Sequence, residues 1–522
     1  MSGRKGIPME REWETETLVG LLERTAASFG ERTAVVDRFE RMTYAELLDA
    51  SKRIAGFFFA HSIEKGDRVI VQMPNSVMFE VVCFALFSLG ALPVFILPMH
   101  REHVIEALCE ASQPKAYVTS QDSLDRECYA IGVRMLERCG SLERLFTDVQ
   151  LRNELSSGRV VECDIESPKP GDVAFLSLSG GTTGIPKLIG RTNGAYSYNA
   201  LITARHCRMD ADSVMLTAIP AAHNFALGTP GMIGTVLVGG KNVMCEYPSP
   251  LEILDWIGRE QVTIASFVPT VSSLCVRYRS IDASDDIGSL QYFLVGGSVF
   301  SPVQAREAEA AFEARLVQVY GMAEGMTFLT DLDAPDDVRY GSQGRPRSPE
   351  DVFRIVDEDF ADVEDGVEGE VIVKGPYTIK RYFGDVPANE SSFRDGFYRP
   401  GDKGLRLPSG DIRITGRVHE QINRAGEKIM PSEVEDVLMG MDAVSECAVV
   451  GVADEVLGTA ICAFYIGERD IELVEAAAYM RSRHMEDCCI PDQLQRLDSW
   501  PLTAVGKIDR EGLKEAAVHG GK

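Results

Sequence analysis

The sequence predicts an α/β fold with a large amino-terminal domain of helix-covered sheets and a small, mobile α+β domain at the carboxyl terminus. Over about the first 350 residues, short apolar runs typical of buried strands alternate with longer runs typical of helices, and this alternation predicts a largely parallel sheet. After about residue 350, short strand-like segments separated by turn residues follow one another. A chain of 522 residues is long enough to form several such units.

The alternation of strands and helices is clearest between residues 67 and 120. In chain order it predicts a strand at 67–74, a helix at 76–90, a strand at 93–97, a helix at 101–111 and a strand at 116–120. Residues 81–98 approach the length of a membrane span, but Gly90 and Pro93 divide this run. A buried helix followed by a buried strand is therefore favoured over a membrane segment. The pattern returns at 213–220, 251–269 and 290–297.

The last third of the chain predicts two further parts. Strand-like segments and turns predict a short-stranded β subdomain at about 350–416, within an amino-terminal domain of residues 1–416. Residues 417–522 carry their own helix and strand signals, so we expect the small α+β domain there. The hinge-like segment 416–428 would join the two domains.

Composition limits the partners and the compartment. The chain has 53 lysines and arginines against 79 acidic residues, a formal charge of −26, and such a field disfavours binding to nucleic acid or to an anionic membrane. Its 12 cysteines are scattered and form no CxxC pair, which indicates reduced thiols in a cytoplasmic protein. The first 16 residues contain no apolar run, so we expect no secretory signal.

A glycine-rich loop within LSLSGGTTGIPKLIG, residues 176–190, is suited to holding phosphate. The glycines allow backbone amides to face an anion, and the hydroxyls and the lysine add donors and positive charge. These residues are Ser179, Gly180, Gly181, Thr182, Thr183, Gly184 and Lys187. Pro186 and Leu188 stand where a P-loop kinase needs glycine and serine or threonine, so that class is excluded. By itself, the loop could equally be a structural turn.

Seven motifs in order resemble the adenylate-forming superfamily, which includes acyl-CoA synthetases, luciferases and the adenylation domains of peptide synthetases. They are SGGTTGIPK (179–187), HNF (223–225), VGGS (295–298), VYGMAEG (319–325), FYRPGD (397–402), GRVHEQINRAGEKI (416–429) and PLTAVGKIDR (501–510). The likeness spans nearly the whole chain, and several motifs look like the aryl-acid branch, which adenylates 2,3-dihydroxybenzoate or salicylate in siderophore pathways.

The resemblance implies the residues that bind ATP and magnesium. Glu324 is a hard oxygen donor suited to Mg²⁺, Tyr320 would offer an aromatic face to adenine, and Asp402 would bind the ribose hydroxyls. Besides the loop residues 179–184 and Lys187, the family pattern assigns the nucleotide to Gly297, Tyr320, Gly321, Asp402, Arg417 and Lys428.

For catalysis, the resemblance points to Lys507, His223 and Thr183. A cation such as Lys507 would reduce the repulsion between an attacking carboxylate and the α-phosphate, and His223 would lie next to that carboxylate. The family alternates between two orientations of its small domain, and the matching pivot here is His419, where the family commonly has aspartate or lysine. Ala425 replaces a glycine of close relatives, which puts thioester formation in doubt.

The segment AAHNFALGTPG, residues 221–231, is the most informative about the acid. In the aryl-acid branch, the asparagine matching Asn224 hydrogen-bonds a ring hydroxyl ortho to the carboxylate. A neutral amide would leave the ammonium of an α-amino acid unpaired, so amino acids are disfavoured. Gly228, Thr229 and Phe225 differ from close relatives, and we expect the glycine to open space, which leaves a larger or modified ring possible. The acid is assigned to Asn224, Phe225, Thr229, Gly296, Met322 and Thr327.

The implied function is that of an aryl acid adenylating enzyme that uses ATP and Mg²⁺. It would form an aryl adenylate and pyrophosphate, then transfer the aryl group to the phosphopantetheine thiol of a separate aryl carrier protein. Coenzyme A as acceptor is the main alternative, and a non-catalytic paralogue that binds an aromatic acid or a nucleotide is a second. The sequence leaves the acid and the choice between monomer and homodimer open.

Overall fold

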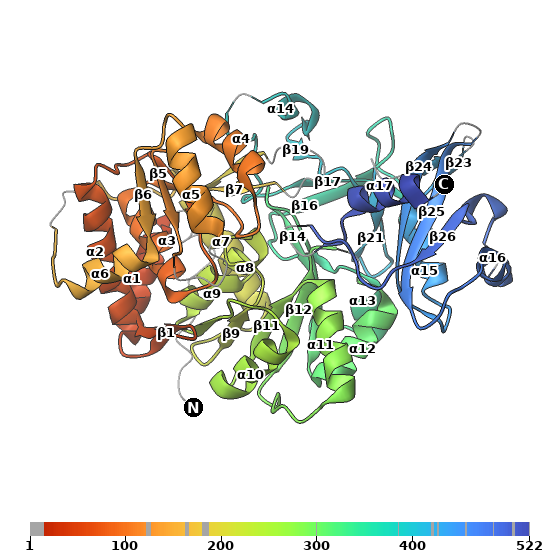
Figure 1. Ribbon diagram of the computed structural model, residues 1–522, viewed down its shortest axis with the longest axis horizontal. Helices are drawn as coiled ribbons and strands as arrows, with labels where there is room; N and C mark the ends of the chain where they lie inside the picture. The colour runs from red at the N-terminus through yellow and green to blue at the C-terminus, as the bar shows by residue number, and fades with distance from the viewer. Residues whose placement is uncertain are drawn as a thin grey trace. The chain divides into compact units, whose positions relative to one another are not determined.

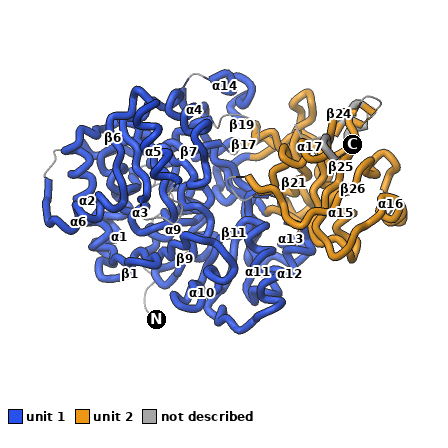
Figure 2. The backbone as a smooth tube through the Cα atoms, viewed as in Figure 1, with its two compact units in different colours: residues 1–340, 344–352, 374–398 blue, residues 341–343, 353–373, 399–522 orange. Residues whose placement is uncertain are grey.

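The computed structural model describes every part of the chain except 1–14, 122–126, 162–165, 180–186, 299, 385, 419–421, 425–426, 455–456, 484, 504–506 and 521–522. The chain divides into two compact units, shown in Figure 2. The first comprises residues 1–340, 344–352 and 374–398, and the second comprises residues 341–343, 353–373 and 399–522.

The first unit contains two large sheets, each built mainly from parallel strands (Figure 1). In the larger sheet the central strands β13, β12, β11, β9, β10 and β1 run parallel, and β15, β14 and β2 join antiparallel at the edges. In spatial order the strands are β15 (Arg345–Pro346), β14 (Thr327–Leu329), β13 (Arg315–Gly321), β12 (Tyr292–Gly296), β11 (Ile264–Phe267), β9 (Val214–Thr217), β10 (Lys241–Met244), β1 (Thr33–Val36) and β2 (Arg41–Thr43).

The second sheet of this unit ends in an antiparallel hairpin. Its strands are, in spatial order, β6 (Arg144–Thr147), β5 (Ala116–Thr119), β3 (Arg68–Gln72), β4 (Leu92–Phe95), β7 (Val173–Leu178) and β8 (Leu188–Thr192). Strands β7 and β8 pair antiparallel, with Leu178 opposite Leu188, whereas the others pair in parallel. The loop predicted to hold phosphate therefore connects the two strands of this hairpin.

Helices alternate with the strands of the first unit and join most of its parallel strands, as the alternating pattern predicts. They are α1 (Leu18–Phe29), α2 (Tyr44–Ala60), α3 (Val77–Leu89), α4 (Glu102–Ser112), α5 (Glu127–Arg138), α6 (Asp148–Ser156), α7 (Asn193–His206), α8 (Asn224–Gly228), α9 (Gly231–Val238), α10 (Pro250–Glu260), α11 (Pro269–Ile281), α12 (Pro302–Phe312), α13 (Asp336–Gly341) and α14 (Ala388–Ser391). The short hairpin of β18 (Phe393–Arg394) and β19 (Phe397–Tyr398) also belongs to this unit.

Helix α3 shows why the most apolar stretch of the chain is not a membrane span. Ser76 caps its start by accepting a hydrogen bond from the Phe79 amide, and Gly90 ends it with φ of 64°. Almost every residue of the helix is buried, and the buried strand β4 follows it, as the sequence predicts. Among the described residues, no helix combines the length and the apolarity needed to cross a bilayer.

The second unit consists of short antiparallel strands and a small α+β part. In the first group β17 (Gly369–Lys374) pairs with β16 (Val352–Val356) and with β20 (Asp402–Arg406), which pairs with β21 (Ile412–Arg417). The remaining elements are β22 (Ile422–Arg424), β23 (Glu427–Ile429), α15 (Pro431–Leu438), β24 (Val444–Asp454), β25 (Gly458–Gly467), α16 (Leu473–Ser482), the 3₁₀-helix η2 (Asp487–Cys489), β26 (Gln493–Arg496) and α17 (Arg510–Gly520).

The α/β class, the large amino-terminal part and the small α+β part are confirmed. The boundary between 416 and 417 stays a prediction, and the expected hinge residue His419 lies outside the described residues.

Candidate functional site

Two hydrogen bonds between Ser179 and Lys187, the first and last residues of the phosphate motif, hold together the loop end of the hairpin β7–β8. The Ser179 amide donates to the Lys187 carbonyl at 3.0 Å, and the Ser179 hydroxyl accepts from the Lys187 amide at 2.9 Å. The ends of the loop are thus fixed, and the other predicted phosphate contacts, Gly180, Gly181, Thr182, Thr183 and Gly184, lie outside the described residues.

Lys187 connects this hairpin to a tyrosine that the sequence analysis did not single out. Its ammonium nitrogen lies 4.9 Å from the centroid of the Tyr382 ring, a distance at which a cation is attracted to the face of an aromatic ring. The ring of Tyr382 therefore holds the lysine at the end of the phosphate loop.

The predicted metal ligand Glu324 is held by the same tyrosine. Glu324 lies in the turn after β13 and is only 5% exposed. The Tyr382 hydroxyl donates to its Oε1 at 2.9 Å, and the Tyr398 hydroxyl lies 3.1 Å from that of Tyr382. Burial first, and then the charge of Glu324, raise the pKa of both hydroxyls, so they remain protonated donors.

A carboxylate oriented by neutral donors fits the needs of Mg²⁺. This ion takes one or two protein carboxylates and completes its shell with phosphate oxygens and water. Among the described residues, no group of three or more histidine, cysteine or acidic side chains is arranged to enclose a metal. Glu324 thus suits a metal that arrives with a nucleotide better than one enclosed by protein ligands alone.

His223 and Asn224 begin helix α8, just beyond the carboxyl end of β9. His223 is the N-cap residue, and its Nδ1 accepts from the Phe225 amide at 3.2 Å. Because Nδ1 accepts, the neutral ring carries its proton on Nε2. Ligands of parallel α/β sheets bind beyond the carboxyl ends of strands, and these two residues lie there.

Asn75, which follows β3 in the other sheet, fixes the segment that leads to His223. Its Nδ2 lies within 3.0 Å of the carbonyl oxygens of Thr217, Ile219 and Cys245. Its Oδ1 accepts from the Ala221 amide at 2.6 Å. One buried side chain of the second sheet therefore determines the path of the main chain ahead of α8.

Helix α7 supplies polar contacts around the predicted acid pocket. The Tyr196 hydroxyl donates to Asn224, 3.2 Å from Oδ1 and 3.3 Å from the main-chain oxygen. Asn199 donates to the Gly228 carbonyl at 2.7 Å and accepts from the Thr327 hydroxyl at 3.4 Å. Hydrogen bonds from one face of α7 therefore reach three parts of the predicted pocket, at Asn224, Gly228 and Thr327.

The space beside Gly228 is filled by a protein side chain. A Cβ atom at Gly228 would lie 2.6 Å from three atoms of Tyr196, so any larger residue requires the tyrosine to move. The glycine therefore accommodates Tyr196 and does not open the pocket in the way that we expected from the sequence.

Other predicted contacts with the acid are tightly packed. Phe225 and Thr229 are buried, and a Cβ atom on Gly296 would lie 2.8 Å from the Val319 carbonyl oxygen and 3.3 Å from Phe225. Gly296 therefore permits the close packing of β12 against β13 and against α8. Gly296 and Phe225 thus form a wall at the carboxyl ends of these strands.

Gly297, Tyr320 and Gly321, predicted to contact the nucleotide, lie at the carboxyl ends of β12 and β13. Gly297 is exposed and has φ of 102°, a conformation that favours glycine. Tyr320 is partly buried, and its ring packs 5.2 Å from that of Phe328. Gly321 is exposed, and Met322 accepts from the Gly325 amide in the turn that carries Glu324.

The second unit contains the remaining predicted residues. Arg417 and Asp402 lie opposite each other on β21 and β20, with Arg417 Nε 3.1 Å from Asp402 Oδ1. Lys507 closes a turn: its amide donates to the Thr503 hydroxyl at 3.2 Å, and its carbonyl accepts from the Thr503 amide at 2.7 Å. Lys428 lies on β23, but its side chain is outside the described residues.

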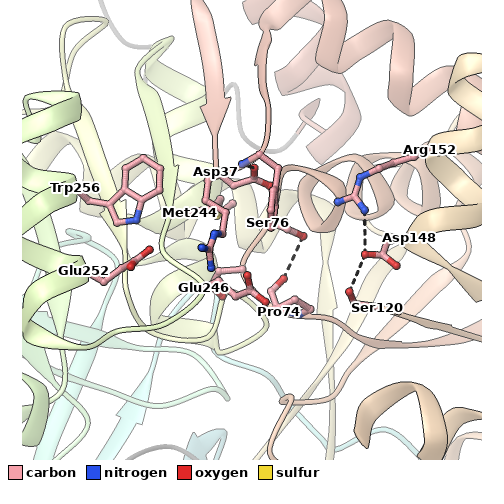
Figure 3. Close-up of a pocket in the computed structure, with 13 residues that line it drawn as sticks. Asp37, Pro74, Ser76, Ser120, Asp148, Arg152, Met244, Glu246, Glu252 and Trp256 are labelled. Carbon is pink, nitrogen blue, oxygen red and sulfur yellow. Dashed lines mark hydrogen bonds and ion pairs between the residues drawn. The ribbon is translucent and has the colours of Figure 1, made fainter. Parts of the chain in front are cut away.

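A pocket of the first unit is lined by none of the residues predicted to bind ATP or the acid (Figure 3). It opens at the carboxyl ends of β1, β3, β5 and β10, and Trp256 and Glu252 of α10 form one of its walls. Asp148 accepts from Ser120 at 2.7 Å and from Arg152 at 3.1 Å. Asn75 also lines this pocket, but no residue predicted to bind ATP or the acid does so.

The comparisons with known proteins agree with the motifs. The AMP-binding enzyme family profile matches residues 22–383, and that of the AMP-binding enzyme C-terminal domain matches residues 433–507. A 2,3-dihydroxybenzoate-AMP ligase of Bacillus subtilis is 38% identical over 97% of this chain and 94% of its own length. A salicyl-AMP ligase / salicyl-S-ArCP synthetase of Mycobacterium tuberculosis is 36% identical over 96% of this chain and 91% of its own.

Among solved structures, the apo structure of MbtA from Mycobacterium smegmatis matches with a TM-score of 0.74 and 35% identity, over 97% of this chain and 95% of that one. The family profile covers more than half of the chain, and both relatives match nearly from end to end. The chain therefore belongs to the AMP-binding enzyme family and is an ATP-dependent, adenylate-forming ligase.

Proposed function

We propose that the protein activates an aromatic carboxylic acid and passes it to the phosphopantetheine thiol of an aryl carrier protein, in siderophore or aromatic-capped peptide biosynthesis. The observation that carries this proposal is Asn224, a neutral amide at the start of α8 beside His223. A carboxylate there would pair with the ammonium of an amino acid, whereas an amide matches an uncharged ring substituent. Two relatives at 36% and 38% identity are named as ligases of salicylate and of 2,3-dihydroxybenzoate, which supports the same class of acid.

In the first half-reaction, a carboxylate oxygen of the acid attacks the α-phosphorus of ATP. The new bond joins that oxygen to phosphorus, and the bond from phosphorus to the bridging oxygen breaks and releases pyrophosphate. Both reactants are anions, so the step needs positive charge around them. We assign this task to Lys187 at the phosphate hairpin and to Lys507, and we assign hydrogen bonds to the phosphates to Ser179 and the loop with Thr182 and Thr183.

In the same proposal, Tyr320, Gly297 and Gly321 contact the adenine of the nucleotide. Asp402 and Arg417 contact its ribose. Mg²⁺ bound at Glu324 would neutralise charge on the phosphates. The chain itself orients the Glu324 carboxylate, because the Tyr382 hydroxyl donates to Glu324 Oε1 at 2.9 Å.

In the second half-reaction, the acceptor thiol loses its proton and its sulfur attacks the carbonyl carbon of the aryl adenylate, and AMP leaves. We propose that the carboxyl-terminal domain changes orientation about His419 between the two steps. The name of the Mycobacterium tuberculosis relative includes an ArCP thioester, which favours a carrier protein over coenzyme A. All described cysteines are free thiols, in keeping with a cytoplasmic protein.

A pyrophosphate-exchange panel tests the proposal. Salicylate, 2,3-dihydroxybenzoate, amino-hydroxybenzoates, picolinate and quinaldate are each offered with ATP and Mg²⁺, with α-amino acids as the comparison. Exchange that depends on an aryl acid is expected. If no aryl acid supports exchange, the remaining interpretation is a non-catalytic paralogue that binds an aromatic acid or a nucleotide. The loaded adenylate is then offered a carrier protein and coenzyme A in parallel, and efficient thioester formation on coenzyme A alone would assign an aryl-CoA ligase.

A further inference from the structure

The turn that carries Lys507 is closed by its own main chain. Leu502 and Ile508 face each other in an antiparallel bridge. The Asp509 amide donates to the Pro501 carbonyl at 2.8 Å. These contacts join the two arms of the turn to each other but not to the rest of the second unit. The position of Lys507 therefore depends on what holds the two arms.

The first arm follows Trp500, which is anchored to β24. The indole Nε1 of Trp500 donates to Glu446 Oε2 at 2.6 Å. Its side chain is buried in an apolar cluster formed by residues of β24, β25 and α17. Apolar packing and one hydrogen bond thus hold this arm.

The second arm leads into Arg510, the first residue of α17, which is anchored through its charge. Its Nη1 donates to the Val449 carbonyl at 2.5 Å, and its Nη2 lies 2.8 Å from Oε1 of Glu435 on α15. The same Glu435 oxygen accepts from the Val449 amide at 2.7 Å. Arg510, Glu435 and Val449 thus form a closed ring of hydrogen bonds that joins α17, α15 and β24.

The stability of α17 does not explain this arginine. A cation in the first turn of a helix opposes the helix dipole. The start of α17 is already capped by Asp509, whose Oδ1 accepts from the Gly512 amide at 3.2 Å. Glu435 is only 8% exposed, and a buried carboxylate is costly unless a cation pairs with it. Both members of the pair therefore carry a cost, which points to a role beyond the helix.

We infer that Arg510 and Glu435 are positioning residues that hold the Lys507 turn for the attack on the α-phosphorus. This inference rests on the proposed function, in which Lys507 supplies positive charge to that step. A lysine side chain is long and flexible, so the place its ammonium reaches depends on where the turn is held. A misplacement of about 1 Å can reduce a rate by about 10²-fold. Arg510 and Glu435 act through Lys507 and not on the reactants themselves.

The test measures the two half-reactions separately in Glu435→Gln. Glutamine can still accept from the Val449 amide but removes the charge opposite Arg510. With the most active acid of the aryl panel, kcat for pyrophosphate exchange should fall about tenfold, the equivalent of one charge-assisted hydrogen bond, and the KM for ATP should not change. Thioester formation from the supplied aryl adenylate should keep its wild-type rate, because Lys507 is assigned to the first half-reaction only.

A double-mutant cycle separates positioning from a merely structural role. In a Lys507→Ala enzyme, adding Glu435→Gln should cause no further loss of exchange, because both changes act on the same group. Arg510→Lys keeps a cation opposite Glu435 and should retain more exchange activity than Arg510→Gln. If Glu435→Gln does not fold, this comparison of the two Arg510 variants carries the same test.

Glu511→Gln is the matched control. Glu511 is the next residue of α17, and it pairs with Lys514 at 2.7 Å. Loss of this carboxylate also breaks an ion pair of the helix, but it should leave both half-reactions unchanged.

Three results would overturn the inference alone: wild-type exchange in a folded Glu435→Gln enzyme, equal losses in the two half-reactions, or a full additional loss when Glu435→Gln is combined with Lys507→Ala. Near-normal exchange in Lys507→Ala would remove this lysine from adenylation, and the inference with it. A wild type that shows no exchange with any aryl acid would overturn the proposed function itself.

Discussion

Replacing Glu80 by glutamine is expected to stabilise the protein at neutral pH and to remove part of the pH dependence of its stability. Glu80 lies in the first turn of α3 and is completely buried. Its two carboxyl oxygens are 3.3 and 3.4 Å from Asn242 Nδ2, and no cation pairs with it among the described residues. Burial therefore raises its pKa from an ordinary value of 4.5 to about 8.

The sign of the effect follows from proton binding. Between pH 4.5 and 8, the folded protein keeps the proton on Glu80, whereas the unfolded chain releases it. The folded state thus binds more protons than the unfolded state, and the free energy of unfolding falls as the pH rises through this interval. Each pH unit lowers the free energy of unfolding by about 1.4 kcal/mol. Glu80 therefore destabilises the fold by roughly 3 kcal/mol at pH 7 relative to pH 4.5. A neutral glutamine has no such dependence.

Urea unfolding at pH 5 and pH 7.5, followed through tryptophan fluorescence, to which Trp256 contributes, measures the difference. Trp256 is buried in the same compact unit as Glu80. The matched control is Glu260→Gln, because Glu260 has ion-pair partners: Arg41 at 2.7 Å and Lys241 at 2.9 Å. We expect Glu80→Gln to gain stability mainly at pH 7.5 and Glu260→Gln to lose stability at both values. Parallel loss of stability with pH in the wild type and Glu80→Gln would refute the reasoning.

Three further substitutions test the site. Asn75→Asp keeps the oxygen that accepts from Ala221 but places a second oxygen against three carbonyls, and should raise the KM for the acid and lower stability by about 1–3 kcal/mol; unchanged acid kinetics would show that the hydrogen bonds to these carbonyls do not position α8. Tyr382→Phe removes the donor to Glu324 but keeps the ring, and should raise the Mg²⁺ concentration for half-maximal exchange about tenfold, measured by titrating Mg²⁺ at fixed ATP. Lys507→Ala should slow exchange by roughly 10² to 10³-fold or more, and near-normal exchange would remove this lysine from the adenylation step.

The fold could be predicted from the sequence because its signals are local. The run from Ser76 to Leu97 contains a capping serine, an apolar helix, a glycine stop and a short apolar strand, and each signal lies within a few residues of its effect. The same holds for β24 and β25, whose apolar residues and turn are contiguous in the chain.

The groups that orient the site could not be predicted in this way. Motifs identified Glu324 and Asn224, but their partners Tyr382 and Tyr196 are 58 and 28 residues away in the chain, and Asn75 is 146 residues from Ala221. No periodicity or spacing encodes contacts between segments that only the tertiary fold brings together. Gly228 illustrates the same limit, because a glycine in a sequence does not reveal which side chain occupies the space beside it.

Helix α7 places Tyr196, Asn199 and Thr203 at positions i, i+3 and i+7, on one face of the helix. Their partners, Asn224, Gly228 and Thr327, belong to the predicted acid pocket. The residues assigned to ATP in the first unit belong instead to the β7–β8 hairpin and to the carboxyl ends of β12 and β13. We therefore expect substitutions along this one face to alter the accepted ring while the adenylation machinery stays intact. Such separation allows descendants of an ancestral ligase to acquire new aromatic building blocks one side chain at a time, and it marks α7 as the element to randomise in a library designed to diversify the product.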